Sequence, residues 1–429
     1  MPIVGGRVGV LAAAVFLLGA APPDGASVAA KRGPVLPASA RTPAKADDAS
    51  EAKEVKAPSP GRAKSEERKA NDTASARKLS PAMTTLRDRI RQVEAQYFRQ
   101  PVNTGDNTAA EVIAFCLAFG CDAEIRYGNS AGNPMSGVGC LAFGYPCSGY
   151  QVLTVGDSSA IVARVGYGLQ EHPGEFLAML AQAAVPASYE IRVGDRRGSV
   201  ADLVESEKGT CQAGTDLAHR LIGLSFYLRN GETWRGRTGE EWSVERVLRE
   251  ELARNPANDC CDVAHHLLAL SFAVQRRQRE SKPMDGQYRR AEKYVRDLQE
   301  YALGLANADG SWHPGFFAAR GTTRDNPGQL RSTGHLLEWL AFSLPEEKLE
   351  DPRVVRSVTY VATLLAEPYA RWNVTASTPR EIDSVMHAVC ALRIYDRRAF
   401  KSFEPVEEPG PTGQPKTTLR GKPLKGAPR

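Results

Sequence analysis

The chain has 429 residues and a formal net charge of +5, and the positive excess lies near its two ends. Residues 30–82 carry 12 basic and 7 acidic side chains, and residues 401–429 carry 6 and 3. Apart from Arg7 and Asp24, which cancel, the remainder holds 36 basic and 39 acidic residues. The central part is therefore near neutral and has no basic stripe, which argues against a nucleic-acid-binding protein.

The amino terminus has the pattern of a secretory signal peptide. Arg7 precedes an apolar, small-residue-rich run from Val8 to Ala21, and two prolines follow it. The small residues Ser27 and Ala29 suit signal peptidase cleavage. An uncleaved anchor is the alternative, but the run falls short of the ~20 apolar residues of a membrane span. We expect a signal peptide over residues 1–29, export to the periplasm or the extracellular space, and no membrane span after processing.

Two segments have the composition of disordered chain. Residues 30–82 are rich in Ala, Pro, Lys and Glu and nearly lack aromatic and branched apolar residues, and residues 401–429 are rich in Pro. Such segments cannot bury enough apolar surface to offset their ordering entropy. We predict a disordered linker over 30–82, a disordered tail over 401–429, and a folded part divided at about residue 200.

The first folded part, residues 83–200, has a mixed pattern. Ala109 to Ala118 and Gly174 to Ala184 have helical periodicity. Gln151 to Arg164 alternates around Gly156-Asp157 as a β-hairpin does, and Ile191 to Arg196 predicts a further turn. This region is expected to be a small mixed α/β insertion or cap.

Four cysteines in this region admit several states: Cys116, Cys121, Cys140 and Cys147. An even set of cysteines in an exported chain favours disulfides, at least one pair of which we expect to be oxidised. A zinc site or buried free thiols are the alternatives.

Residues 201–400 have helical periodicity almost throughout. The predicted helices are Ala201 to Glu207, Thr215 to Leu228, Trp242 to Arg254, Asp262 to Gln278, Tyr288 to Leu305, Ser332 to Leu344, Arg353 to Glu367 and Ile382 to Tyr395. Every second helix is apolar nearly all round, whereas its neighbours have one apolar stripe. A helix of the first kind is covered on both sides, and one of the second kind has a wet face.

The apolar helices form an internal repeat of about 46 to 70 residues. When they are aligned, one histidine of each falls at the same place: His219, His265, His335 and His387. Alternating inner and outer helices predict an α/α toroid of helical hairpins, so that the fold is mainly α with the mixed region as a cap. An open superhelix of helix pairs is the alternative.

A short motif adds a resemblance to this pattern. Asn307-Ala-Asp-Gly-Ser-Trp312 follows an outer helix and resembles the Asp-Gly-Ser-Trp turn of the terpenoid cyclases and protein prenyltransferases, a squalene-cyclase-like superfamily of α/α toroids. The chain lacks the Asp-x-Asp-Asp and Asp-Cys-Thr-Ala-Glu motifs of the cyclases. The resemblance therefore implies the fold, over roughly residues 170–396, and not squalene cyclisation.

Carboxylates accompany three of the four repeated histidines. Asp216 and Asp262 lie three residues before a histidine, and Asp383 lies four before one, so each pair shares a helix face. A carboxylate beside an imidazole suits a general base or a metal ligand. These residues are the candidate catalytic set: His219, His265, His335, His387, Asp216, Asp262 and Asp383. Alternatively, the aspartates are helix N-caps and the histidines fill a repeated structural position.

The same resemblance suggests a metal. Protein prenyltransferases hold zinc with an Asp-x-Cys at the start of one inner helix and a histidine near the start of the next. The matching residues here are Asp259, Cys261 and His335, a ligand set that suits zinc. Alternatively, Cys260 or Cys261 pairs with Cys211. Export and the lack of a partner-subunit pattern argue against protein prenylation.

Two classes of function fit these features. One is an enzyme of cyclase, lyase or hydrolase type that uses a His/Asp-lined central cavity on a small extracytoplasmic lipid or glycan. The other is a non-catalytic binding or scaffold protein built on the same toroid. Shifted histidine pKa values in a deep pocket favour the enzyme, and a filled centre with an exposed apolar patch favours the scaffold. No pattern identifies a protein partner.

Overall fold

A computed structural model describes residues 79–156, 159–256, 260–315, 317, 320–323, 325–367 and 378–400. These residues belong to one compact unit within Pro34–Arg429. The predicted signal peptide, nearly all of the predicted linker, the predicted tail and Asp259 lie outside the described residues.

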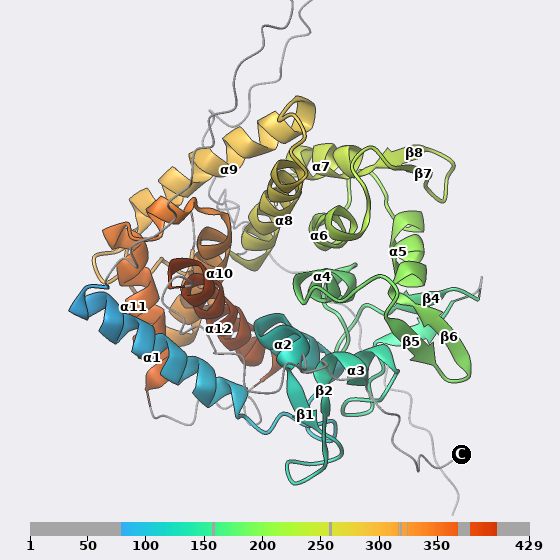
Figure 1. Ribbon diagram of the computed structural model, residues 1–429, viewed down its shortest axis with the longest axis horizontal. Coiled ribbons are helices and arrows are strands. Elements are labelled where there is room, and N and C mark those ends of the chain that lie inside the picture. Colours follow the sequence, from blue (N-terminus) through green and yellow to red (C-terminus); the bar gives the residue numbers. More distant parts are fainter. Residues whose placement is uncertain are drawn as a thin grey trace, which may run out of the picture. The chain divides into compact units, whose positions relative to one another are not determined.

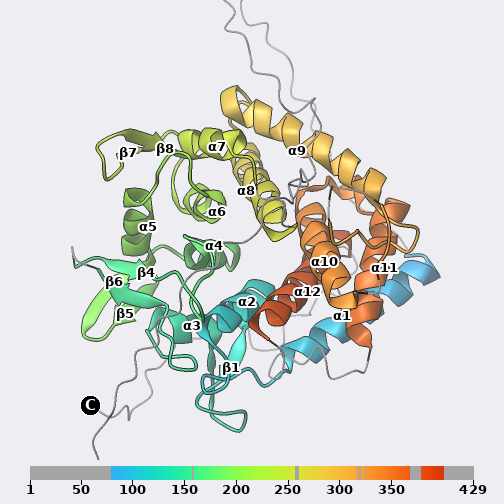
Figure 2. The same cartoon turned by 180° about the vertical axis from the view of Figure 1, so that it is seen from behind.

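The described part of the chain is mainly helical, as the sequence predicts (Figures 1 and 2). The even-numbered helices are α2 (Ala109–Phe119), α4 (Glu175–Gln182), α6 (Ala218–Tyr227), α8 (Cys260–Arg279), α10 (Asn326–Ser343) and α12 (Pro379–Ala399). The odd-numbered helices are α1 (Pro81–Phe98), α3 (Gly137–Ala142), α5 (Val200–Gly209), α7 (Val244–Ala253), α9 (Gly286–Leu305) and α11 (Pro352–Ala366).

The even-numbered helices are the more deeply buried layer. In α4 the whole run from Phe176 to Ala181 is buried, and α10 buries nearly every residue from Gln329 to Ala341. In α9, by contrast, the buried positions recur at helical spacing, from Tyr288 to Leu303, and the rest of the helix is open to water. Helices with apolar residues all round thus lie inside, and helices with one apolar stripe cover them.

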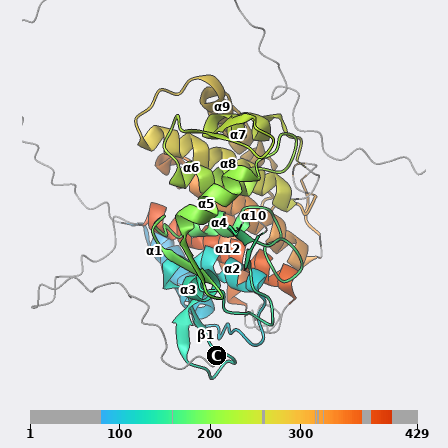
Figure 3. The same cartoon turned by 90° about the vertical axis from the view of Figure 1, so that its right-hand side faces the viewer.

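The even-numbered helices form a closed series of contacts. Each contacts the next one along the chain from α2 to α12, and α12 contacts α2. The odd-numbered helices pack outside: α5 contacts α4 and α6, α7 contacts α6 and α8, and α11 contacts α10 and α12 (Figures 1 and 3).

Within the described ranges, four two-stranded antiparallel hairpins connect the helices. One is the predicted hairpin, in which β3 (Leu153–Val155) pairs with β4 (Ile161–Ala163), and a second, in which β5 (Glu190–Val193) pairs with β6 (Arg196–Ser199), contains the predicted turn. The other two, β1 (Glu124–Arg126) with β2 (Pro134–Ser136) and β7 (Thr233–Arg235) with β8 (Glu241–Ser243), were not predicted.

Two predicted boundaries need correction. Helix α1 begins at Pro81, where the Ser80 side chain accepts a hydrogen bond from the Met83 amide, so the last residues assigned to the linker are helical. The alternation of buried and covering helices also starts upstream of residue 201, because α2 and α4 belong to the inner layer. The mixed region of residues 83–200 therefore supplies part of the helical array as well as three hairpins.

Helices α10 and α12 approach each other closely at one glycine. A Cβ atom on Gly334 would lie 2.9 Å from the Cβ of Ala388, which is closer than such atoms can come. Because Gly334 precedes His335 and Ala388 follows His387, the close approach brings these two imidazoles together.

The Asp-Gly-Ser-Trp segment forms the expected tight turn. Gly310 has φ +92° and lies against the backbone of Arg356, where a side chain has no room. Trp312 is almost fully buried, and its indole N–H donates to the Ala302 carbonyl at the end of α9. The turn thus anchors the chain between α9 and α10.

The seven cysteines whose side chains the structure describes form no disulfide with one another. The Cys211 thiol donates to the Glu207 carbonyl, whereas Cys261 accepts a hydrogen bond from Arg331. Among the described residues, no helix has both the length and the apolar character that crossing a bilayer requires.

Candidate metal centre in a histidine-lined pocket

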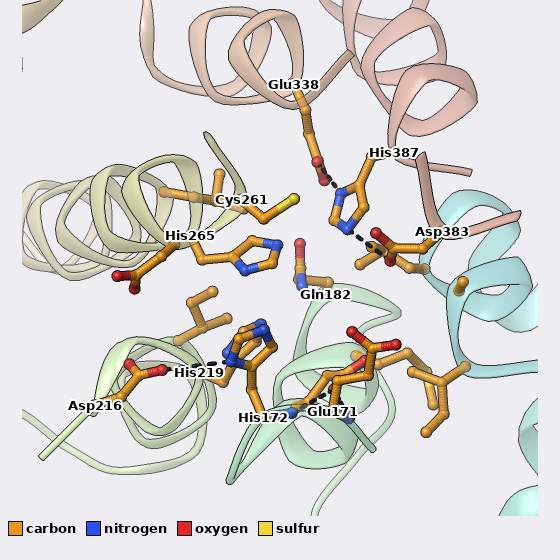
Figure 4. Close-up of a pocket in the computed structure, with 18 of the residues that line it drawn as sticks. Glu171, His172, Gln182, Asp216, His219, Cys261, His265, Glu338, Asp383 and His387 are labelled. Carbon is orange, nitrogen blue, oxygen red and sulfur yellow. Dashed lines mark hydrogen bonds and ion pairs between the residues drawn. The ribbon is translucent and has the colours of Figure 1, made fainter. Parts of the chain in front are cut away.

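A cavity of about 600 Å³ lies among the inner helices. Six of the seven predicted catalytic residues line it: Asp216, His219, Asp262, His265, Asp383 and His387. The seventh, His335, stacks on His387 with 4.1 Å between ring centroids. The inner helices therefore bring all seven together, and Figure 4 shows the labelled members around the cavity.

The imidazole rings form a continuous cluster. His265 is at its centre, with ring centroids 4.7 Å from His219, 5.2 Å from His387 and 5.6 Å from His335. A fifth ring, that of His172, lies 5.0 Å from His219 and 5.4 Å from His265. Five of the seven histidines of the chain are thus in one place.

Sequence reasoning missed His172 and Glu338. His172 lies three residues before α4, outside the region in which the repeat was recognised, although the apolar run of α4 could have extended the repeat to it. Glu338 is buried in α10 three residues after His335. An acidic residue within so apolar a helix was the available indication of a role at the site.

Three of the imidazoles are placed to share a metal ion. One ring nitrogen from each of His265, His335 and His387 lies within 4.8 Å of the others, and a second group with the same spacing consists of Cys261, His335 and Asp383. Both groups contain His335. Together they form one buried cluster that could hold a metal.

Hydrogen bonds fix which nitrogen of two histidines is left for a metal. His335 donates from Nδ1 to the Arg331 carbonyl at 2.8 Å, and His387 donates from Nδ1 to the Glu338 carboxylate at 2.5 Å (Figure 4). The Nε2 atoms therefore face the cluster, where they lie 3.8 Å and 3.3 Å from the oxygens of Asp383. Metal-binding histidines typically have such a partner on the other nitrogen.

His265 differs from both of them. It is 8% exposed, and neither of its ring nitrogens has a hydrogen-bond partner within the described part of the chain. Burying such a group without a partner costs on the order of 1 to 3 kcal/mol. The burial of an imidazole without a hydrogen-bond partner, beside two other imidazoles, is explained if it binds a ligand.

The second group does not have the geometry of a Cys-His-Asp triad. A triad needs one imidazole nitrogen on the thiol and the other on the carboxylate. Here Nδ1 of His335 is bonded to the Arg331 carbonyl, and the same Nε2 that could reach Cys261 faces Asp383. A metal ion can bind a thiolate, an imidazole and a carboxylate at once, so the arrangement fits coordination better than nucleophilic catalysis.

The electrostatics of the cluster favour a cation. Burial opposes charge on His387, but Glu338 and Asp383 outweigh it and hold the pKa of His387 well above its usual range. Burial also opposes charge on Asp383, yet His387 and His335 keep its pKa below the ordinary value. The buried carboxylate of Glu338 and the partly exposed one of Asp383, both beside one imidazole, provide a negative site that a proton or a metal ion can neutralise.

Elsewhere in the cluster, burial keeps imidazoles neutral. Burial is the largest effect on His265 and His219, and neighbouring imidazoles add to it. The pKa of His265 falls well below its usual range, and that of His219 falls to about 3. Neutral imidazoles are the form that binds metals.

The side of the cavity formed by α4, α6 and α7 carries a different set of groups. His172 lies 3.5 Å from Asp216, and this hydrogen bond raises the pKa of His172. Asp216 also accepts from the Ala218 amide at the start of α6, and burial raises the pKa of Glu175 to about 7.

The carboxylate of Glu251 in α7 accepts hydrogen bonds from the Leu217 amide, from Arg254 and from His266. Arg254 in turn bonds Asp262 at 2.7 Å. The carboxylates therefore have different roles: Asp216 caps a helix start, Asp262 pairs with Arg254, and Asp383 faces the histidines one turn inside α12.

The predicted metal set is retained only in part. The structure brings Cys261 and His335 together with Asp383, whereas Asp259 lies outside the described residues. Cys116, Cys121, Cys140 and Cys147 belong to none of the metal-capable groups found in the described ranges.

Comparisons with family models, with curated proteins and with solved structures find no match to this chain.

Proposed function

We propose that this protein is an exported zinc-dependent enzyme that acts on an extracytoplasmic lipid or glycan in the central cavity of an α/α toroid. The observation that carries the proposal is the trio His265, His335 and His387, whose ligand atoms lie within 4.8 Å of one another at the wall of the cavity that His265 and His387 line. The reaction is of hydrolase, lyase or cyclase-like type.

The toroid is supported by the order of helix contacts. The inner helices contact one another in sequence order, and α12 contacts α2. An open superhelix has no contact between its first and last inner helices. Likeness to the squalene-cyclase superfamily is part of this proposal and depends on the helical pattern and the single Asp-Gly-Ser-Trp turn.

Zinc is the metal that the ligands favour. Three imidazoles with a carboxylate or a thiolate nearby make a borderline-soft set, whereas magnesium and calcium take oxygen ligands. Three protein nitrogens would leave a coordination position for substrate, as catalytic zinc sites do. Zinc at such a site supplies a Lewis acid for polarising a carbonyl or activating water.

The chain's own residues would divide the remaining work. Glu338 and the Arg331 carbonyl hold His387 and His335 in orientation. On the other side of the cavity, His172 hydrogen-bonded to Asp216 has the pairing of a general acid or base. The cavity also has an apolar wall that can hold the non-reacting part of a lipid or glycan ligand. This wall consists of Ile113, Leu117, Met179, Ile222 and Leu268.

The pocket also favours an enzyme over the alternative, a non-catalytic scaffold. Perturbed pKa values in a cavity are typical of catalytic sites, and here His219 and His387 are shifted in opposite directions. A scaffold has no need of buried imidazoles without partners, such as His265.

The test is metal-dependent turnover by the mature, purified chain. Zinc is removed with a chelator, the protein is incubated with a panel of lipids and oligosaccharides, and products are detected by mass spectrometry with and without added zinc. We expect turnover that the chelator abolishes, that zinc restores, and that Asp383→Asn lowers about 100-fold or more. Turnover that is the same in the metal-free protein, or none on any substrate by a zinc-loaded protein, contradicts the proposed enzyme.

A further inference from the structure

Two cysteines far from the histidine cluster lie in direct contact. The Sγ atoms of Cys140 and Cys147 are 3.7 Å apart, and both side chains are fully buried. A disulfide has its sulfurs about 2.05 Å apart, so the two sulfurs need to approach by only about 1.6 Å to form one.

The backbone between the two cysteines is already folded into a compact loop. Cys140 lies in α3, and the Tyr145 amide donates to the Cys140 carbonyl at 3.1 Å. Cys147 and Tyr150 exchange two backbone hydrogen bonds, each of 2.9 Å. Both ends of the loop are therefore held by backbone hydrogen bonds while the two sulfurs are in contact.

The other two cysteines of the region have different surroundings. Cys121 is exposed, and its thiol donates to the Ala183 carbonyl. Cys116 is buried against α3, where its Sγ would lie only 2.7 Å from a Cβ placed on Gly137. Among these four cysteines, Cys140 and Cys147 are the pair whose sulfurs are in hydrogen-bond contact.

We propose that Cys140 and Cys147 form a disulfide in the exported protein, while Cys116 and Cys121 remain thiols. The oxidant is a small or protein disulfide, such as oxidised glutathione. One cysteine thiolate attacks it and releases a thiolate, and the second cysteine attacks the mixed disulfide and releases another. The chain loses two protons and two electrons, and the oxidant is reduced to two thiols.

Burial of the two thiols determines at which stage of folding the disulfide can form. The hydrogen bond with Cys147 and burial both raise the pKa of the Cys140 thiol, so the attacking thiolate is scarce in the folded chain. Oxidation is therefore expected during folding, when the thiols meet solvent, and to be slow once the chain has folded.

The bridge would fasten a loop beside the cavity wall. Ser148, next to Cys147, donates from its amide to the Thr104 carbonyl, and Thr104 precedes α2 by a few residues. Helix α3 itself packs on α2, whose Ile113 lines the cavity. Oxidation thus restrains the supports of α2 and leaves the histidine cluster unaltered.

The experiment is refolding of the full chain with oxidised and reduced glutathione, then digestion under non-reducing conditions. Chymotrypsin suits it because it cleaves after Phe143, which lies between the two cysteines, so that only a bridge joins the fragments. We expect a linked Cys140–Cys147 peptide, and a Tm about 3 to 6 °C above that of the reduced protein, as for closure of a short loop.

Two cysteine variants test whether the linked peptide and the Tm difference come from the Cys140–Cys147 bridge. Cys147→Ser is expected to abolish the linked peptide and the Tm difference, whereas Cys121→Ser keeps both. A free Cys140 and Cys147 after oxidative refolding, or a bridge to Cys116 or Cys121, overturns the proposal. The peptide map of the wild-type chain decides even if Cys147→Ser fails to fold, and zinc binding is not required for any of these results.

Discussion

Replacing His335 by alanine is expected to weaken zinc binding by the full chain at least ~100-fold, because loss of an outer-shell partner alone costs 10- to 100-fold and a ligand contributes more. His335 is common to both metal-capable groups, so its replacement removes a ligand from each of them. Isothermal titration of the chelator-treated protein with zinc measures the change.

His313→Ala is the matched control. His313 lies on the loop after the Asp-Gly-Ser-Trp turn and belongs to neither metal-capable group, so its variant should bind zinc as the wild type does. Because His335 is 1% exposed, circular dichroism must first show that its variant is folded. A folded His335→Ala protein that binds zinc with unchanged affinity would remove His335 from the site.

The largest loss of stability is expected for Glu251→Ala, at about 3 to 5 kcal/mol of unfolding free energy, as for breaking a buried ion pair. Glu251 is fully buried, and its carboxylate accepts from Arg254 at 2.9 Å and from His266 at 2.7 Å. Its removal leaves the Leu217 amide, at the start of α6, without this acceptor. Urea unfolding at neutral pH measures the difference.

The neighbouring Glu250 on the same helix is the control for that variant. Its side chain, which pairs with Arg249 and Arg246, is 19% exposed and that of Arg249 is 52% exposed, so these ion pairs are in contact with solvent and should contribute about 0 to 1 kcal/mol. Glu250→Ala should therefore lose less than ~1 kcal/mol. Equal losses in the two variants would mean that the buried network around Glu251 does not hold α6, α7 and α8 together.

The sequence was most informative where a pattern repeats over many residues. Apolar helices alternate with amphipathic ones, and the inner layer follows this alternation because a helix covered on both sides has no wet face. The common position of His219, His265, His335 and His387 likewise predicted that they meet. Equivalent residues on helices that contact in order end up on one side of the cavity they enclose.

The rest of the site depends on contacts between segments that no local pattern connects. The motif Asp259-Cys-Cys261 suggested a ligand from the chain just before α8, which lies outside the described residues; within them, the carboxylate beside Cys261 and His335 is Asp383 of α12. It is there because Gly334 lets α10 and α12 approach. His172 precedes a helix instead of lying within one, so the register of the repeat did not include it.

Anomalous X-ray scattering at the zinc edge, from crystals of the mature chain grown with one equivalent of zinc, tests the central claim most directly. The account predicts one strong peak about 2.0 to 2.1 Å from ring nitrogens of His265, His335 and His387, with Asp383 or Cys261 beside it. A peak elsewhere on the chain, or none near these imidazoles in zinc-containing crystals, would contradict it.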